Sequence, residues 1–522
     1  MQVELERPFI EDAPINLVPP KGWTYSDNGI FEEVTDRNTG ITVDKLACKT
    51  PILITRRLSS VESGEEKIEV SCKRDHRWKT AIYNRTTVFQ TRSIIDLANM
   101  GCMITSENAK KVVQFLGALE EQNDDRIPLV ESTSTMGWKS NMHHFLPGHG
   151  GDIVIDVEPA QRGMVDAYCS HGSYGDWKKT MQPHRGRAKF RFILASAFAA
   201  PLLRPLKQRG FFVYNWADSR GGKTAALKAA LSVWGNPDRL MVNFNATMVA
   251  MERMSKLNCD LPLGVDERQL AGHKQDLLDL IVYMVASGKG KARGTRSGGL
   301  EDPGEWLTIG LATGEEPLVT SSSQTGVSTR LLEIDGPPFE TEAEAAEMHT
   351  LASEDYGWAG PEYIERLLNI DMDDLDTAHR AMRDFLQSIS GKTNGAHIGS
   401  VATVALADAL ADTWIFGREM DGSEDGYLAA LGISVRSWET AKVMAEEIFS
   451  GCVMRNAMDV NENALQFMID WISANTASFK QDTRGQWYGE YSDDKKEIYI
   501  LYSSIKDALR SAGFSATKTL RY

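Results

Sequence analysis

The sequence predicts a multidomain α/β protein built around a five-stranded parallel sheet. Its 522 residues exceed what a single hydrophobic core normally holds. Between 206 and 340, short apolar runs alternate with helical patterns, which is the order typical of parallel sheets. The five expected strands are "FFVYNW" from 211, "RLMVNF" from 239, "CDLPLGVDE" from 259, "WLTIGLATG" from 306 and "TRLLEI" from 329. Ligands of such sheets lie at the carboxyl ends of the strands.

Four segments are expected to flank this core. The N-terminal part mixes strand-like runs with one helix at 106–122, for which Ser106 is the expected N-cap. The last segment reads helix, loop, strand, helix and stops at Tyr522 within its expected reading element, as it would in a piece of a longer protein. The predicted domains are an N-terminal α+β domain with a nucleic-acid contact at 1–135, a loop-rich and helical connector at 136–205, the core at 206–340, a helical lid region at 341–455 and a winged-helix-like module at 456–522.

Composition narrows the class of protein. A net charge of −15 argues against a surface coated with nucleic acid, but it leaves room for local basic patches. No apolar run reaches membrane-spanning length, and the acidic N-terminus lacks the order of a signal peptide. The six cysteines lie far apart without a CxxC pair and are expected to be reduced thiols. We therefore predict a cytoplasmic protein with no membrane partner.

The loop after the first core strand, "ADSRGGKT", follows the phosphate-binding pattern G-x-x-x-x-G-K-[ST] except at its first position. Backbone amides of such a loop cradle phosphates, the lysine reaches the outer phosphates and the hydroxyl holds Mg²⁺. ATP and Mg²⁺ are therefore the expected ligands. Because alanine does not adopt a positive φ cheaply, Ala217 puts the geometry at the start of the loop in question. The alternative is a glycine-rich turn that happens to contain Gly-Lys-Thr. The candidate nucleotide-binding residues are Asp218, Ser219, Arg220, Gly221, Gly222, Lys223 and Thr224.

Later strand ends carry the candidate catalytic residues. Asp266 and Glu267 end the third strand, where one carboxylate would join Thr224 in holding the magnesium and the next would polarise the attacking water. Thr313, at the end of the fourth strand, is either a sensor hydroxyl between the γ-phosphate and the water or part of a strand-end turn. Arg330, at the start of the fifth strand, is either an arginine finger pointing at a neighbouring subunit's nucleotide or a surface arginine in an ion pair.

Two basic stretches are candidates for nucleic-acid binding. The segment "SGKGKARGTRSGG" is predicted to form a β-hairpin that tracks a phosphate backbone. Its cations are Lys289, Lys291, Arg293 and Arg296. The second stretch, residues 73–92, has six cations with Trp78, Tyr83 and Phe89 interleaved; these aromatics either stack on bases or belong to a core.

From about residue 20 to 340 the chain resembles the bacterial and phage "domain of unknown function 927" family. The resemblance rests on "GWTYSDNG", "STMGW", "AFAAPLL", "GGKTAALKAALSVWGNP", "DLPLGVDE", "ASGKGKARG" and "TGEEPL". The family's usual loop reads G-x-S-S-x-G-K-T, from which this chain departs at Ala217 and Arg220. The family is similar to AAA+ ATPases and, in part, to MCM-type replicative helicases, including those of staphylococcal cassette chromosome elements.

The resemblance implies an AAA+ core, a hexameric ring with hydrolysis at subunit interfaces, 3′–5′ translocation on single-stranded DNA and a C-terminal winged helix. Lys223, Thr224, Asp266, Glu267 and Arg330 match the family's ATPase positions. The expected function is thus an ATP-dependent DNA helicase or translocase that replicates a mobile element or prophage. Its expected partners are single-stranded or forked DNA, further copies of the chain, and a primase or polymerase. The alternatives are an AAA+ ATPase that loads or remodels a protein without moving on DNA, and a degenerate, structural phosphate-loop protein.

Overall fold

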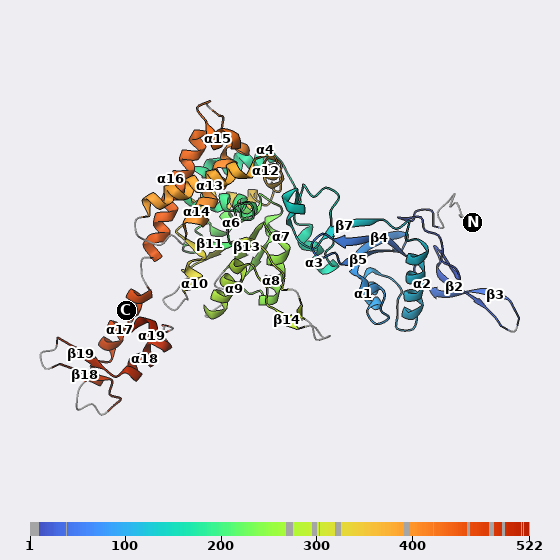
Figure 1. Cartoon of the computed structure of the whole chain (residues 1–522), viewed down its shortest axis with the longest axis horizontal. Helices are drawn as coiled ribbons and strands as arrows, with labels where there is room; N and C mark the ends of the chain where they lie inside the picture. Colours follow the sequence, from blue (N-terminus) through green and yellow to red (C-terminus); the bar gives the residue numbers. More distant parts are fainter. Residues whose placement is uncertain are drawn as a thin grey trace. The chain divides into compact units, whose positions relative to one another are not determined.

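The computed structural model divides the chain into two compact units, residues 1–166 and 167–522 (Figure 1). Their boundary falls within the segment 136–205, which we predicted to be a connector. Among the described residues, no helix is both long and apolar enough to cross a bilayer. The structure describes residues 10–37, 39–267, 275–294, 300–301, 303–318, 325–390, 397–420, 422–456, 460–479, 485–492, 496–512, 514 and 516–520.

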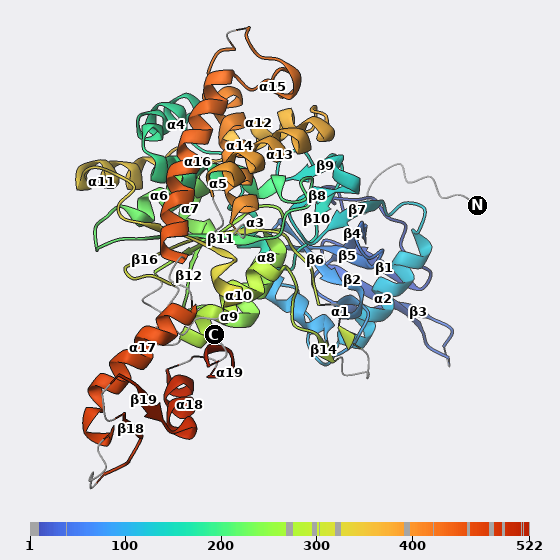
Figure 2. The same ribbon diagram turned by 60° about the vertical axis from the view of Figure 1, so that its left-hand side comes forward.

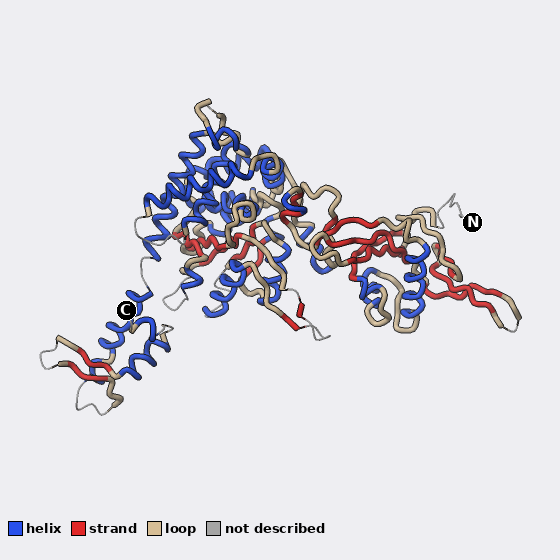
Figure 3. The backbone as a smooth tube through the Cα atoms, in the orientation of Figure 1, coloured by secondary structure: helices blue, strands red, loops and turns tan. Residues whose placement is uncertain are grey.

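The first unit combines a mixed five-stranded sheet with a small antiparallel one, and Figure 3 shows its strands in red beside few helices. The large sheet has the order β10-β7-β4-β5-β6, in which β4, β5 and β6 form an antiparallel meander and β7 and β10 run parallel to β4. The strands of this sheet are β4 Ile52–Ser60, β5 Glu66–Arg74, β6 Arg77–Asn84, β7 Leu129–Thr133 and β10 Val154–Ile155. The remaining strands and α-helices of the unit are β1 Trp23–Ser26, β2 Gly29–Thr35, β3 Thr42–Cys48, α1 Arg85–Val88, α2 Ala109–Gln122, β8 Gly137–Lys139, β9 His144–Leu146 and α3 Pro159–Val165.

Helix α2 supplies much of the apolar core of this unit. Its buried residues recur at the helical spacing i, i+3, i+4, i+7 and are Val112, Phe115, Leu116 and Leu119. The predicted N-cap, Ser106, is wrong: the N-cap is Asn108, and Ser106 lies in the preceding turn. Asn108 Oδ1 accepts a hydrogen bond from the Thr105 amide at 2.8 Å, which closes that turn and delays the start of the helix.

The aromatic residues of the basic stretch 73–92 belong to the core. Trp78, Tyr83 and Phe89 all pack in or against the apolar cluster of the first unit. Lys73 of the same stretch forms ion pairs with Asp12 and Asp27, both at 2.6 Å. Of the two alternatives, the core interpretation of these aromatics is therefore confirmed.

The second unit contains the five-stranded parallel sheet that the sequence predicts. Four strands lie within their predicted runs and the fifth, β17, extends one residue beyond its run, to Asp335; the order across the sheet is β12-β13-β16-β11-β17. The chain therefore places its first core strand, β11, in the interior of the sheet between its fourth and fifth. The strands are β11 Phe211–Trp216, β12 Met241–Asn243, β13 Pro262–Asp266, β16 Ile309–Gly314 and β17 Leu331–Asp335.

Helices cover the sheet and continue into a helical region. Helix α9 buries Leu278, Ile281, Val282 and Val285 against the strands. Helix α5 is buried almost all round because it contacts α6, α14 and α16, and Figure 2 shows α16 alongside α14 and α5. Up to residue 456, the α-helices of this unit are α4 Tyr174–Met181, α5 Ala188–Ala199, α6 Lys223–Leu231, α7 Pro237–Leu240, α8 Met248–Leu257, α9 Gln275–Ser287, α10 Thr325–Ser328, α11 Glu342–Leu351, α12 Ala359–Leu367, α13 Met372–Ile389, α14 Ile398–Trp414, α15 Gly426–Leu431 and α16 Val435–Asn456.

A buried ion network joins α14 to α5 and the turn before it. Arg185 donates to Asp408 at 3.1 Å and to Asp412 at 2.9 Å, and Arg191 pairs with Asp408 at 2.6 Å. Burial alone would raise the pKa of Asp412, but the charges of Arg185 and Arg191 outweigh it and hold that pKa at about 2. Removing one member would leave an uncompensated buried charge, so the network fixes how these helices pack.

Two buried histidines of the helical region make its stability depend on pH. Burial lowers the pKa of His379 and of His397 to about 4, so both are neutral in the fold at pH 7. A histidine in the unfolded chain titrates near pH 6.5, so the unfolded state takes up protons first as the pH falls from 6.5 to 4. We expect the free energy of unfolding of this unit to fall by about 2–3 kcal/mol per histidine across that window. Urea unfolding at pH 7 and pH 4.5 measures the loss; His379→Gln should reduce it by the share of that one histidine, about 2–3 kcal/mol, and equal stability at both pH values would refute the assignment.

The C-terminal residues form a small module of helices and a two-stranded sheet. The predicted strand and last helix are confirmed as β19 and α18, while β18 and α19 are additional. Ile505, Leu509 and Phe514 are buried together with Ala464 of α17, so the module has its own apolar cluster. Its elements are α17 Val460–Ala474, β18 Gly489–Tyr491, β19 Ile498–Ile500, α18 Tyr502–Ser511 and α19 Ala516–Thr519.

Candidate functional site

The predicted phosphate loop connects β11 to α6 at the carboxyl edge of the parallel sheet. The strand before it is buried, and α6 begins at Lys223 directly after the last glycine. Asn215 fixes the end of the strand by donating from Nδ2 to the carbonyls of Ile334 and Gly336, both at 3.0 Å. A strand, a glycine-containing turn and a helix N-terminus thus follow one another as a phosphate site requires.

Ala217 does not disturb the loop in the way that the sequence suggested. The residues of the loop with positive φ are Arg220 at 64° and Gly222 at 78°, and Ala217 is not among them. Ala217 is buried, and its amide donates to Gly314 at 3.4 Å. The left-handed conformation lies later in the loop, so an alanine fits where the pattern has its first glycine. The prediction that a positive φ would be needed at Ala217 is therefore wrong.

Lys223 folds back over the loop that precedes it. Its Nζ donates to the carbonyl of Ala217 at 2.8 Å and to that of Asp218 at 2.7 Å. Burial lowers the pKa of Lys223, and the nearby carboxylates of Glu315 and Asp266 partly oppose that shift. The ammonium is thus held above the loop by carbonyls, which an incoming anion can replace.

Asp266, the last residue of β13, connects candidate residues from the start of α6, from the position that follows it and from the end of β16. Its Oδ1 accepts hydrogen bonds from Thr224 Oγ1 at 3.3 Å, from the Glu267 amide at 3.0 Å and from Thr313 Oγ1. Asp266 and Thr313 are 7% and 4% exposed, so the cluster is shielded from solvent. The structure therefore brings together the residues predicted to hold magnesium and the predicted sensor hydroxyl.

Glu267 differs from its neighbour in both conformation and exposure. It adopts a φ of 59°, which is unfavourable for a residue with a side chain, and it is exposed. Strain of this kind costs about 1–3 kcal/mol and concentrates at functional sites. The left-handed turn directs the backbone away from the strand direction immediately after Asp266.

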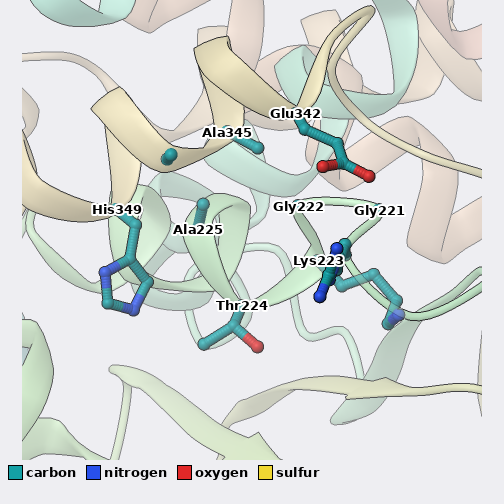
Figure 4. Close-up of a pocket in the computed structure, with 10 residues that line it drawn as sticks. Gly221, Gly222, Lys223, Thr224, Ala225, Glu342, Ala345 and His349 are labelled. Atoms are coloured by element: carbon teal, nitrogen blue, oxygen red, sulfur yellow. The ribbon is translucent and has the colours of Figure 1, made fainter.

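A pocket of about 360 Å³ lies over the loop, and helix α11 forms its other wall (Figure 4). Figure 4 shows Glu342, Ala345 and His349 of that helix on one side of the pocket and Lys223 and Thr224 on the other. Sequence reasoning assigned α11 only to a helical lid region and missed these residues. The one available signal was the Ala345–Ala346 pair, because small side chains allow a helix to approach a glycine loop closely. The loop residues that line the pocket are Arg220, Gly221, Gly222, Lys223, Thr224 and Ala225.

Gly222 is required both by its backbone conformation and by close packing. A Cβ at this position would lie 2.6 Å from Phe339 and 2.7 Å from the Cβ of Ala345. We expect Gly222→Ala to lower the free energy of unfolding by about 2–4 kcal/mol, combining left-handed strain with overpacking. Gly451→Ala on α16 is the matched control, because a Cβ there meets nothing within 4 Å and alanine favours a helix. Urea unfolding of both variants checks this; equal effects would mean that α11 does not press on the loop.

Arg330 lies at the amino ends of the parallel strands, whereas the phosphate loop lies at their carboxyl ends. It precedes β17, and its carbonyl accepts from the Phe212 amide at the start of β11 at 2.8 Å. Its guanidinium lies 4.5 Å from the centre of the Tyr283 ring and donates to Gly326 O at 2.7 Å, and its Nε is buried without a partner. The six residues of β11 place roughly 20 Å between these amino ends and the loop of the same chain. Arg330 therefore cannot reach its own phosphate loop.

The basic segment forms a short hairpin, but two of its cations are engaged in ion pairs. β14 Arg293–Gly294 pairs antiparallel with β15 Leu300–Glu301. Lys289 contacts Glu305 at 2.9 Å, and Arg293 contacts Glu252 of α8 at 2.6 Å. Lys291 is exposed, and the predicted contact Arg296 lies outside the described residues. These ion pairs leave the hairpin with less net positive charge than the sequence alone suggests.

Comparisons with known proteins identify the family. The family model described as "Domain of unknown function (DUF927)" matches residues 23–304, and the one described as "Cch helix turn helix domain" matches residues 459–521. A solved structure described as "SCCmec type IV Cch - active helicase" covers 97% of this chain and 94% of its own, with 18% sequence identity and a TM-score of 0.66. At that identity the likeness establishes a shared fold. No curated protein matches the sequence significantly.

The fold and the cluster at the sheet edge define a multidomain α/β protein with a strand, glycine loop and helix in the phosphate-binding order. Because the first family model covers more than half of the chain, the chain belongs to the DUF927 family. The resemblance drawn from the sequence is thereby confirmed.

Proposed function

We propose that the chain is an ATP-dependent DNA helicase or translocase of the MCM-like AAA+ type, acting in the cytoplasm in the replication of a mobile element or prophage. One observation carries the proposal. The carboxyl ends of the parallel strands bring together Lys223, Thr224, Asp266 and Thr313, while Arg330 lies at the amino ends of the same strands. A fold that separates a phosphate loop from its arginine suits a nucleotide site shared between copies of the chain.

The donor set at Asp266 fits a magnesium ion. Mg²⁺ prefers oxygen ligands and is held in nucleotide sites by a hydroxyl and a carboxylate, which Thr224 and Asp266 supply 3.3 Å apart. When bound, the ion would neutralise charge on the transferred phosphoryl group. Lys223 would exchange its two carbonyl partners for phosphate oxygens, and Glu267 would accept a hydrogen bond from the attacking water. Thr313 would place a hydroxyl between that water and the terminal phosphate.

Two parts of the chain support a DNA substrate. The C-terminal module matches the helix-turn-helix family model, and such modules insert a helix into the major groove. The basic hairpin lies between α9 and β16 in the chain, and Lys291 at its start is exposed. We expect single-stranded or forked DNA to be the substrate and a hexameric ring of this chain to be the active form, with a primase or polymerase as partner.

A second candidate function is a nucleotide-driven remodeller of a protein partner. The ion pairs of Lys289 with Glu305 and of Arg293 with Glu252 favour it, because they leave less positive charge on the hairpin for a phosphate backbone. The two functions differ in whether DNA matters to hydrolysis.

The test is ATP hydrolysis with and without single-stranded DNA, with Lys223→Ala as the blank. The proposal predicts hydrolysis that DNA stimulates several-fold and that the variant lacks. Hydrolysis indifferent to DNA would favour the protein remodeller, and no hydrolysis by the intact chain would favour a degenerate, structural loop.

A further inference from the structure

A second arginine lies beside Arg330 at the amino edge of the sheet. Arg209 precedes β11 and Arg330 precedes β17, and these two strands pair directly, with Phe212 opposite Leu331. Arg209 Nη2 donates to the Thr329 carbonyl at 2.6 Å, and Arg330 Nη1 donates to the Gly326 carbonyl at 2.7 Å. Both guanidinium groups are therefore fixed by carbonyls of one short segment, residues 326–329.

No acid neutralises this pair within the described part of the chain. Neither Arg209 nor Arg330 forms an ion pair there, whereas Arg185, Arg191, Arg366, Arg380 and Arg418 of the same unit each do. Burial lowers the pKa of Arg209, and the like charge of Arg330 lowers it further. Burial and the charge of Arg209 also lower the pKa of His397, to about 4, so the third nearby titratable group is kept neutral.

Two adjacent cations with unused donors form a receptor for an anion. The Nε of Arg330 is buried without a hydrogen-bond partner in the described part of the chain, so the protein itself does not satisfy every donor of this guanidinium. Arg209 is exposed, so its remaining donors face solvent. Guanidinium groups bind phosphate oxygens through paired hydrogen bonds, and two of them suit a group that carries more than one negative charge.

We propose that Arg209 and Arg330 together form one anion-binding site that takes the terminal phosphates of a nucleotide held by the phosphate loop of a second copy of the chain. Arg209 is the second cation of this site, and it is exposed whereas Arg330 is partly covered by Tyr283. The inference rests on the proposed function and deepens it. The roughly 20 Å between the two edges of the sheet excludes the chain's own nucleotide as the ligand.

The test begins with Arg209→Ala in the full chain. We expect ATP turnover to fall at least tenfold, while binding of a fluorescent ATP analogue to the variant's own loop stays within twofold of the intact chain. Arg209→Lys should keep part of the turnover, because it retains the charge and loses the paired donors. The control is Arg380→Ala, which removes an exposed arginine of α13 whose one ion pair, with Asp376, is of the weak i, i+4 kind.

Mixing variants distinguishes a partner's arginine from a structural one. Subunits with Arg209→Ala keep an intact loop, and subunits with Lys223→Ala keep Arg209, so mixed assemblies should recover turnover that neither variant has alone. No recovery, or full turnover by Arg209→Ala alone, would overturn this proposal and leave the proposed function standing. An intact chain without any hydrolysis would overturn both.

Discussion

Replacing Arg330 by alanine should reduce ATP turnover by about 10³- to 10⁵-fold, the range measured for arginine fingers in other nucleotide hydrolases. The reason is geometric: Arg330 is roughly 20 Å from its own loop, so under the proposed function its charge would act on a nucleotide bound by a neighbour. Binding of ATP to the variant's own loop should be unchanged. Quenched time courses with labelled ATP measure turnover, and equilibrium titration with an ATP analogue measures binding.

Arg330→Lys is the informative companion variant. Lysine keeps the charge but cannot reproduce the planar pair of donors, and it loses the stacking on Tyr283. The ATP turnover of Arg330→Lys should therefore lie between that of the intact chain and that of Arg330→Ala. Weakened ATP binding with normal turnover per bound site would contradict the assignment, because it would place Arg330 in its own subunit's site.

Glu267→Gln should abolish hydrolysis and preserve nucleotide binding. Loss of a general base costs about 10²- to 10⁴-fold in rate, while the amide keeps nearly the same shape. Because Glu267 is exposed and contributes only its amide to the Asp266 hydrogen bonds, the substitution should leave the strand end intact. The variant should therefore hold ATP without turning it over.

Asp266→Asn is the matched control, because it makes the same acid-to-amide change at the neighbouring position. Its carboxylate accepts three hydrogen bonds, so this substitution should weaken magnesium-dependent nucleotide binding as well as turnover. If Glu267→Gln lost binding as severely as Asp266→Asn, the division of labour between the two acids would be wrong.

The sequence predicts well those elements whose structure is determined by the order of apolar and turn residues within a short segment. The five core strands are short apolar runs bounded by turn residues, and the residues at their carboxyl ends meet at one edge because parallel strands align. Thr224, Asp266 and Thr313 could therefore be placed near one another from spacing and strand order alone.

Features that depend on distant packing could not be predicted. Arg220 rather than Ala217 takes the left-handed conformation in the loop, a choice that the sequence does not encode locally. Helix α11 lies over the loop although more than a hundred residues separate the two in the chain. Only the folded structure shows that Ala345 of this helix leaves no room for a side chain at Gly222. The pairing of Arg293 with Glu252 spans 41 residues in the chain and changes how basic the hairpin is.

The most direct test of the central claim is strand separation on a forked DNA duplex by the intact chain, with Lys223→Ala and Glu267→Gln in parallel. The proposed function predicts ATP-dependent release of the labelled strand by the intact chain and none by either variant. Release that does not need ATP, or ATP hydrolysis without any strand release, would contradict a DNA helicase driven by this phosphate loop.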